Sequence, residues 1–193
     1  KGFEELIKWD KMVAKSQNNQ KSSLHSKQET TNQRKQNKDK ISLSKDQYKA
    51  YQQLLSGNNV FLTGGAGTGK SFVLQLFINE MEKQNKNVIV CAPTGIAAIN
   101  IQGVTIHRCF QVSPEPQVVK YIKKVPQVVK ESDIIVIDEI SMCRIDLFDF
   151  VVRTIMKAEE NSLSRKQIVV VGDFFQLPPV TTDNDLEVLK EIY

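Results

Sequence analysis

Residues 64–71, with the sequence GGAGTGKS, limit the possible folds of this chain more than any other segment. They match the pattern G-x-x-x-x-G-K-[ST] and lie between a strand-like run, VFLT, and a helix-like run, SFVLQLF. A glycine-rich turn at such a junction directs successive backbone N–H groups towards one point, where the helix N-terminus adds a partial positive charge. The segment predicts a phosphate-binding loop in an α/β fold; the alternative is a glycine-rich turn followed by a chance Lys-Ser pair.

The residues of this loop have distinct expected roles. Lys70 is predicted to reach the β- and γ-phosphate oxygens of a nucleoside triphosphate, and the Ser71 hydroxyl to ligate Mg²⁺. Backbone N–H groups are predicted to hold the β-phosphate. The predicted nucleotide-binding residues are Gly64, Gly65, Ala66, Gly67, Thr68, Gly69, Lys70 and Ser71.

Two adjacent carboxylates follow a second apolar run, in the segment IIVIDE at 134–139. Asp138, at the end of the expected strand, is predicted to hold Mg²⁺ through water. Glu139 is then placed as the general base for an attacking water, a role that belongs to hydrolysis rather than to stable nucleotide binding. The alternative is a strand end with ordinary surface acids.

A third run, VVVGDFFQLPPV at 169–180, passes into a loop stiffened by two prolines. Ligands bind at the carboxyl ends of the strands in open α/β sheets. Gln176, which lies in this loop, is therefore predicted to sense the γ-phosphate. The alternative is an exposed loop glutamine without a function.

The apolar runs and the stretches between them predict the fold. Four short strands are expected at Val60–Thr63, 88–91, Ile134–Ile137 and 168–171, each apolar enough to be buried on both faces of a sheet. Helical stretches separate them, with apolar stripes at Phe72, Leu76, Ile78 and Met81 and at Phe148, Val151, Val152, Ile155 and Met156. The alternation predicts an α/β P-loop NTPase with a parallel sheet wrapped by helices.

Length and composition bound the domain organisation. The chain has 193 residues, 40% of them hydrophobic, and can bury one core, so we expect one domain over residues 41–193. Residues 1–15 show loose helical spacing of apolar side chains and predict a short amphipathic helix. Residues 16–40 hold a single large apolar residue, Leu24, and predict a disordered polar linker. A first residue other than Met suggests a fragment.

Charge and cysteine content point to an intracellular protein. Residues 1–40 carry ten Lys and Arg against five Asp and Glu; such a tail can hold nucleic acid, but a solvated linker is the simpler interpretation. Cys91, Cys109 and Cys143 lack metal-type spacing and are expected to be reduced packing residues. No apolar run approaches the roughly 18 residues that a membrane span needs, so no membrane partner is expected. The expected location is cytoplasmic in a bacterium, and nuclear or mitochondrial in a eukaryote.

Five motifs together resemble one protein family. In chain order they are GGAGTGKS, APTGIAA (92–98), GVTIH (103–107), IDEISM (137–142) and GDFFQLPPV (172–180). This combination closely resembles the Pif family of superfamily-one DNA helicases, over roughly residues 43–180. The resemblance implies a RecA-like motor core that couples ATP hydrolysis to 5′-to-3′ movement on single-stranded DNA, in DNA repair, recombination or telomere and genome maintenance. It also implies the roles expected above for the P-loop, the two carboxylates and Gln176.

The resemblance adds six residues to the expected site. Gln47, in LSKDQ, is expected to read the adenine edge; the alternative is a solvated helix residue. The single-stranded DNA is expected to pass along Pro93, Thr94, Gly95, Thr105 and His107. Threonine hydroxyls and free N–H groups at a helix start suit phosphate oxygens, and a histidine can bond to a phosphate or stack on a base. For His107 the alternative is a structural histidine with satisfied hydrogen bonds.

Motors of this family hydrolyse ATP between two RecA-like domains, the second of which supplies arginines to the γ-phosphate. A second domain is therefore expected downstream, and nothing in the sequence places Arg144, Arg153 or Arg165 in that role. We expect the chain alone to bind ATP and Mg²⁺ weakly, to turn over slowly and not to unwind a duplex. Two alternatives stay open: an ATP-driven switch or loader without unwinding activity, and a single-stranded DNA-binding module. The oligomeric state is not predicted.

Overall fold

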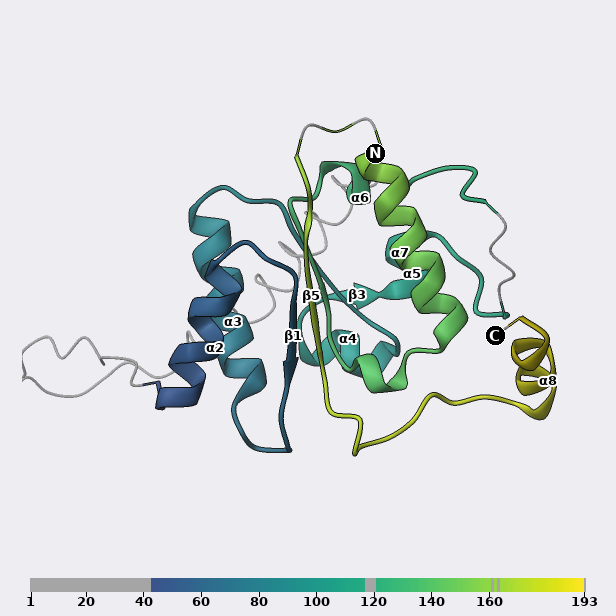
Figure 1. Ribbon diagram of the computed structural model, residues 1–193, viewed down its shortest axis with the longest axis horizontal. Helices are drawn as coiled ribbons and strands as arrows, with labels where there is room; N and C mark the ends of the chain where they lie inside the picture. Colours follow the sequence, from purple (N-terminus) through teal and green to yellow (C-terminus); the bar gives the residue numbers. More distant parts are fainter. Residues whose placement is uncertain (1–42, 117–120, 161, 163, 193) are drawn as a thin grey trace, which may run out of the picture. The chain divides into compact units, whose positions relative to one another are not determined.

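The computed structural model describes residues 43–116, 121–160, 162 and 164–192, in which helices and strands alternate along the chain (Figure 1). In order the elements are α2 (Lys45–Leu55), β1 (Val60–Thr63), α3 (Lys70–Lys83), β2 (Val88–Ala92), α4 (Gly95–Asn100), β3 (Val104–Thr105), α5 (Ile106–Phe110), α6 (Gln127–Glu131), β4 (Ile134–Ile137), η1 (a 3₁₀-helix, Ile140–Met142), α7 (Ile145–Glu159), β5 (Gln167–Gly172) and α8 (Asp183–Ile192). None of these helices is long and apolar enough to cross a bilayer. The helix expected at 1–15 and the linker expected at 16–40 lie outside the described residues.

The strands form one sheet in the order β1-β5-β4-β2-β3, and every neighbouring pair is parallel. Parallel neighbours need crossover connections, and helices lie in these crossovers. The predicted α/β class, with a parallel sheet wrapped by helices, is therefore confirmed. The four predicted strands are observed to within one residue at each end. The prediction missed β3, whose two residues are too few to form an apolar run.

Two hydrophobic cores lie on opposite faces of the sheet (Figure 1). Helices α2 and α3 cover one face, where Leu54 and Phe77 pack against strands β1, β4 and β5. Helices α5, α6 and α7 cover the other face, where Phe110 and Val151 pack against β2 and β4. Because successive side chains of a strand point to opposite faces, the central strand β4 contributes to both cores.

Burial differs between the centre and the edge of this sheet. All four residues of β4 are buried, as predicted for a strand covered on both faces. The same prediction is wrong for β1, where Phe61 is 49% exposed and Thr63 is also exposed. Among the described strands β1 pairs with β5 alone, and α2 and α3 cover only the face that carries Leu62. The exposed face of β1 is therefore a consequence of its edge position.

The apolar stripe predicted for α3 is only partly right. Ile78 and Met81 are buried as expected, but Phe72 is 46% exposed. The first turns of this helix carry apolar residues on several sides, so spacing alone does not select the inner face. The remaining buried residues of α3 are Val73, Leu74 and Phe77. The apolar stripe predicted for α7 agrees better with the structure. Val151 and Ile155 are buried, and only Met156 of the predicted residues is largely exposed.

A buried glutamine of β5 fixes α2 to the sheet. The Gln167 Nε2 donates to the carbonyl oxygens of Leu54 and Asn58, at 2.8 Å each. These carbonyls lie at the end of α2 and in the turn after it, where a helix leaves carbonyl groups without partners. The contact holds α2 beside β1, the strand that leads into the P-loop.

The three cysteines are present as free thiols. Cys91 and Cys109 are buried and Cys143 is half-buried. Burial raises the pKa of Cys143 to about 12. Its thiol is therefore protonated and unreactive at neutral pH.

Candidate nucleotide-binding site

The P-loop connects the end of β1 to the start of α3, at the lower edge of the sheet in Figure 1. Gly64, Gly67 and Gly69 have φ angles of 153°, 74° and 85°. Glycine adopts such angles without strain, which explains why this segment is rich in glycine. Gly69, the N-cap residue of α3, has no side chain to occupy the N–H groups of the first helical turn. These N–H groups stay available to an anion at the positive end of a helix 14 residues long.

Lys70 folds back over the loop from the first residue of α3. Its Nζ donates to the carbonyl oxygens of Gly64 at 2.6 Å and Gly65 at 3.1 Å. The Thr68 hydroxyl also donates to the Gly65 carbonyl, at 2.9 Å. Hydrogen bonds between two charged groups are stronger than those to a neutral carbonyl. Phosphate oxygens can therefore replace these carbonyls as partners of the ammonium group.

Asp138 directly follows β4 and is only 7% exposed. Its Oδ1 accepts a hydrogen bond from the Glu139 backbone N–H at 2.9 Å. Burial raises the pKa of the Asp138 carboxyl and the Glu139 charge raises it further, whereas the Glu139 N–H and Lys70 lower it. A bound cation would oppose this shift by favouring the ionised form.

Glu139 turns the chain sharply out of β4. Its φ and ψ of 52° and 44° place it in the left-handed region, which is uncommon for residues other than glycine and concentrates at functional sites. The Glu139 side chain is half-buried. This conformation brings η1 back towards the sheet edge immediately after the two carboxylates.

The end of β5 packs directly on this turn. A Cβ atom at Gly172 would lie 2.8 Å from Ile140 Cγ2 and 3.1 Å from the Ile140 backbone N, so only glycine fits there. The segments IDEISM and GDFFQLPPV are therefore in contact. Within η1 the Ser141 hydroxyl is buried and has no hydrogen-bond partner among the described residues.

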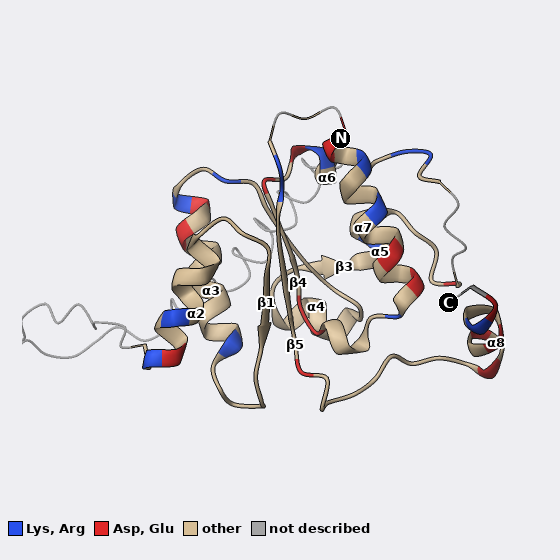
Figure 2. Cartoon of the chain, viewed as in Figure 1, with Lys and Arg blue, Asp and Glu red and all other residues tan. Residues whose placement is uncertain are grey.

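Gln176 lies in the loop after β5, and its side chain is exposed. Its Nε2 donates to Asp173 Oδ2 at 2.9 Å. Hydrogen bonds from Gln176 and from the Phe175 N–H lower the pKa of Asp173, and Lys70 lowers it as well. Strands β1, β5 and β4 are parallel neighbours, so the three predicted motifs that follow them lie at the same edge of the sheet. Figure 2 shows the same pattern, with a basic residue at the start of α3 and acidic residues at the lower ends of β4 and β5.

Sequence reasoning selected Gln176 and missed Asp173. The sequence did contain a signal for this contact. In loops, an Asp side chain commonly accepts a hydrogen bond from the backbone N–H or side-chain amide of a residue two or three positions later.

Gln47, in the first turn of α2, contacts the P-loop. Its Nε2 donates to the Thr68 carbonyl at 3.0 Å, and its Oε1 accepts from the Ser44 backbone N–H at 3.0 Å. The Ser44 hydroxyl in turn accepts from the Gln47 N–H, which completes a capping box. Both ends of the Gln47 amide therefore have partners, one in the helix cap and one in the P-loop.

The residues expected to contact DNA lie at the same edge of the sheet. Strands β2 and β3 are paired at Ala92 and Thr105, so the segments that follow both strands lie together. Thr94 caps α4 and Thr105 caps α5, where their hydroxyls accept from the N–H groups of Ala97 and Arg108. Their O–H groups can still donate. Of the neighbouring residues Pro93 is buried and Gly95 is exposed.

His107, the second residue of α5, is half-buried. Burial lowers its pKa and the Arg144 charge lowers it further, while Asp146 raises it. The imidazole is therefore neutral at pH 7. One of its ring nitrogens can donate a hydrogen bond and the other can accept one. Phe110, in the same helix, is buried in the core and is not exposed to a base.

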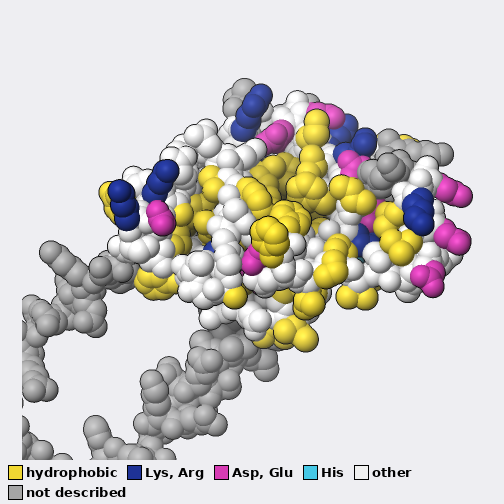
Figure 3. Space-filling model, turned by 60° about the horizontal axis from the view of Figure 1, so that its bottom comes forward, with side chains coloured by type: hydrophobic (Ala, Val, Ile, Leu, Met, Phe, Trp, Pro, Cys, Tyr) yellow, Lys and Arg dark blue, Asp and Glu magenta, His cyan; other side chains and the backbone are white. Residues whose placement is uncertain are grey.

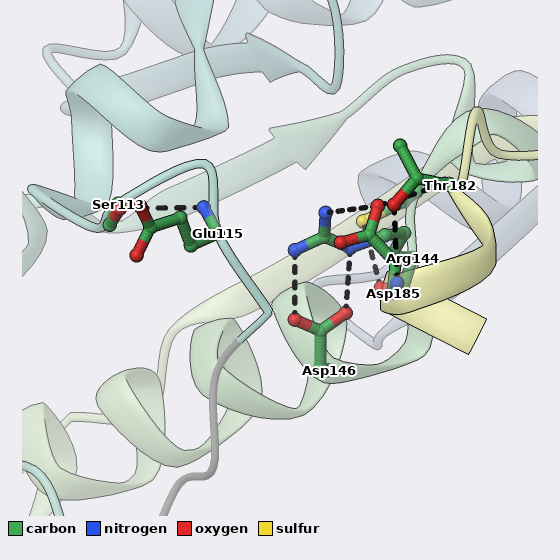
Figure 4. Close-up of polar contacts among 7 residues, drawn as sticks. Ser113, Glu115, Arg144, Asp146, Thr182 and Asp185 are labelled. Atoms are coloured by element: carbon green, nitrogen blue, oxygen red, sulfur yellow. Dashed lines mark hydrogen bonds and ion pairs between the residues drawn. The ribbon is translucent and has the colours of Figure 1, made fainter. Parts of the chain in front are cut away.

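Arg144 forms an ionic cluster just after η1 (Figure 4). Its guanidinium donates to both carboxylate oxygens of Asp146 at 3.0 Å and lies 4.0 Å from Asp185. Asp185 and Thr182 also bond to each other's backbone N–H groups at the start of α8. The cluster attaches the segment after Gln176 to the start of α7. Arg144 is therefore occupied by a structural pairing.

Exposed apolar residues border the site. Figure 3 looks towards the lower edge of the sheet and shows hydrophobic side chains gathered across it. In the loop after β5, Phe174, Phe175 and Leu177 are 67%, 101% and 68% exposed, and the Phe174 ring contacts Phe61 on β1. Such surface next to polar groups is typical of sites that bind other molecules.

Known proteins of one family are similar to this chain in sequence. Residues 42–190 match the model of the PIF1-like helicase family. The ATP-dependent DNA helicase PIF1 of Emericella nidulans is 38% identical over 144 residues, which are 68% of this chain and 19% of that protein. The ATP-dependent DNA helicase Pif1 of Campylobacter jejuni is 33% identical over 154 residues, 74% of this chain and 34% of that protein. The chain thus spans about a fifth to a third of these relatives.

Solved structures give the same result. Bacteroides Pif1 in complex with ADP-AlF4 superimposes with a TM-score of 0.67 at 38% identity, over 79% of this chain and 37% of that protein. Bacteroides Pif1 bound to single-stranded DNA superimposes with a TM-score of 0.67 at 37% identity, over the same shares of the two chains.

Proposed function

This chain belongs to the PIF1-like helicase family, and on that premise we propose that it is the first RecA-like motor domain of an ATP-dependent DNA helicase. One observation carries the proposal. The P-loop lysine, the carboxylate after β4 and the Asp173–Gln176 pair after β5 lie at one edge of the sheet, because β1, β5 and β4 are adjacent and parallel. That combination suits hydrolysis of a nucleoside triphosphate better than simple binding.

The described residues fit ATP and Mg²⁺. The glycines of the P-loop leave room for a phosphate chain beside the open N-terminus of α3, and Lys70 supplies a positive charge. Mg²⁺ in such sites takes one or two protein oxygens besides waters and substrate phosphates. The Ser71 hydroxyl would supply one, and the Asp138 carboxylate would hold the ion through water. When bound, the ion neutralises negative charge that develops on the phosphates. The proposed nucleotide-binding residues are those of the loop, Gly64 to Ser71, together with Gln47.

Three side chains of the chain supply the remaining roles in hydrolysis. Glu139 accepts a proton from the attacking water, as a carboxylate adjacent to the metal-binding Asp138 can do. Lys70 transfers its hydrogen bonds from the Gly64 and Gly65 carbonyls to the phosphates. Gln176 senses the γ-phosphate from the loop after β5.

The activity of the whole protein rests on the relatives, which are several times longer than the matched region. These relatives are ATP-dependent DNA helicases, and Bacteroides Pif1 binds single-stranded DNA. Both facts support a path for single-stranded DNA along Pro93, Thr94, Gly95, Thr105 and His107, and the proposed movement along it is 5′-to-3′. A second RecA-like domain would complete the motor downstream of residues 41–193.

The location of the protein follows from the same proposal. The protein works inside the cell, where its DNA substrate is.

ATP hydrolysis measured with and without single-stranded DNA tests the proposal. We expect DNA to stimulate hydrolysis by the chain, and Lys70→Ala to abolish it. Stimulation by a protein partner but not by DNA would instead support a switch or loader. Unchanged DNA binding and function in Lys70→Ala would support a binding module, because a module does not need the P-loop lysine.

A further inference from the structure

Asp173 occupies an unusual position beside the predicted γ-phosphate sensor. Asp173 is 7% exposed, whereas all of residues 174–178 are exposed. Oδ1 accepts from the Phe175 backbone N–H at 3.0 Å, and Oδ2 accepts from Gln176 Nε2 at 2.9 Å. The Gln176 backbone N–H also donates to the Asp173 carbonyl at 3.0 Å. One buried residue thus holds the backbone and the side chain of the loop together.

Apolar packing does not supply this order. Phe175 is fully exposed and Leu177 is 68% exposed, so neither side chain anchors the loop to the core. Phe174 contacts Phe61 but is itself 67% exposed. Without the Asp173 contacts, the Gln176 side chain would sample several rotamers in water.

The backbone beside the anchor packs closely on η1. Asp173 directly follows Gly172, whose backbone lies so near Ile140 that a Cβ atom would be 2.8 Å from the Ile140 side chain. The backbone that carries Asp173 therefore lies against η1, the 3₁₀-helix that directly follows Glu139. A group that Asp173 holds is thereby placed beside the predicted hydrolytic residue.

The chemistry of the pair determines which way the Gln176 amide points. An amide has a donor end with two N–H groups and an acceptor end with two lone pairs, whereas an ionised carboxylate only accepts. Asp173 can therefore bind only the donor end. No other group among the described residues binds this amide, so the second N–H of Nε2 and both lone pairs of Oε1 are available there.

We propose that Asp173 is the positioning residue for Gln176, fixing its amide so that one N–H is presented to the γ-phosphate of bound nucleotide. The inference rests on the proposed ATP hydrolysis and extends it. A free N–H donates to a phosphate oxygen, while the Oε1 acceptor is turned away from that negative charge. With the amide reversed, Oε1 would face the phosphate and repel it.

Asp173→Asn tests the orientation directly. The Asn Oδ1 can still accept from the Phe175 N–H, but its Nδ2 donates and so selects the Oε1 end of Gln176. We expect Gln176→Ala to slow single-turnover ATP hydrolysis about 100-fold, as loss of a transition-state donor does, and Asp173→Asn to slow it at least about tenfold. The double variant should be no slower than Gln176→Ala, because both changes remove the same interaction. Losses that multiply in the double variant, or an Asp173→Asn rate equal to wild type, would overturn the proposal.

Nucleotide affinity gives a readout independent of turnover. Competition against a fluorescent nucleotide measures the preference for a non-hydrolysable triphosphate over the diphosphate. Asp173→Asn should reduce this preference severalfold and leave diphosphate affinity unchanged. A purely structural role would weaken both affinities equally, and that result would contradict the proposal.

A charge-swapped pair covers the case in which Asp173→Asn does not fold. In Asp173→Asn/Gln176→Glu the Asn amide donates to the Glu carboxylate, so the loop contact is restored with reversed polarity. We expect this variant to melt near the wild-type temperature and to hydrolyse ATP no faster than Gln176→Ala; a wild-type rate would refute the positioning role. If wild type neither binds the triphosphate nor hydrolyses it, the proposed function itself fails, which differs from failure of the Asp173 inference alone.

Discussion

The Gln47 side chain donates from Nε2 to the Thr68 carbonyl oxygen at 3.0 Å and so joins the start of α2 to the P-loop. Its Oε1 is also occupied, by the Ser44 N–H. Each end of an amide has capacity for a second hydrogen bond, so Gln47 can contact an adenine edge without releasing either partner. The nucleotide base and the helix cap would then share one side chain.

Gln47→Glu and Gln47→Ala separate these two roles. The Glu carboxylate keeps an acceptor for the Ser44 N–H at a helix N-terminus, which favours negative charge, but it has no donor for Thr68. Gln47→Ala loses both contacts, and we expect it to lower the free energy of unfolding by about 1 kcal/mol. Gln47→Glu should stay within about 0.5 kcal/mol of wild type in urea unfolding. Both should weaken the preference for ATP over GTP in binding competition; equal stability losses would argue against the capping role.

Gly69 is expected to tolerate no side chain, for two separable reasons. Its φ of 85° is strained for other residues, and a Cβ would lie 2.5 Å from Gln47 Nε2. Gly57 provides a matched control, since its φ is 77° but its Cβ would meet nothing within 4 Å. We expect Gly57→Ala to cost about 1 kcal/mol in urea unfolding with normal nucleotide binding. Gly69→Ala should cost more than Gly57→Ala, because its Cβ would also displace the Gln47 side chain, and it should abolish nucleotide binding.

The strand positions and the P-loop were predictable because both depend on contiguous sequence. A strand buried in a parallel sheet is a continuous apolar run, and the phosphate loop is a fixed run of residue types. The inner face of α3 was not predictable, since the run FVLQLFI offers apolar residues on more than one side. The edge position of β1 depends on the order of strands in the sheet, which no local pattern encodes.

The contacts between distant segments could also not be predicted from the sequence. The Asp173–Gln176 bond is local and had a recognisable signal, but the close approach of Gly172 to Ile140 joins two motifs that are about 30 residues apart in the chain. The contact of Arg144 with Asp185 likewise depends on how α8 returns to the start of α7. The catalytic and DNA-binding roles assigned to individual residues remain predictions.

His107 is expected to make stability depend on pH. Its pKa in the folded protein is lower than its ordinary 6.5, because of burial first and Arg144 second, with Asp146 acting in the opposite direction. Below pH 6.5 the unfolded state therefore binds a proton at this histidine more readily than the folded state does. The free energy of unfolding should consequently fall as the pH decreases through this value. Urea unfolding between pH 7.5 and 5.5 should show this fall, and His107→Gln should reduce it. An NMR titration of the imidazole with a midpoint at or above 6.5 would contradict the assignment.

Ser141 and Ser132 form a matched pair of buried serines with opposite expected effects. The Ser141 hydroxyl has no hydrogen-bond partner among the described residues, although the residue is only 4% exposed. The Ser132 hydroxyl is equally buried but donates to the Val129 carbonyl at 2.9 Å. An unpaired buried hydroxyl costs about 1–3 kcal/mol, whereas a paired one contributes about 1 kcal/mol.

We therefore expect Ser141→Ala to raise the free energy of unfolding by about 1 kcal/mol and Ser132→Ala to lower it by about the same amount, both measured in urea. Each variant removes a single oxygen, so the loss of volume is matched and the difference reports hydrogen bonding. If Ser141→Ala is destabilised as much as Ser132→Ala, the Ser141 hydroxyl has a partner, such as an ordered water. Ser141 follows Glu139 by two residues and lies beside Gly172, so such a water would lie next to the predicted hydrolytic site. In that case Ser141→Ala should also slow ATP hydrolysis, and otherwise it should leave the rate unchanged.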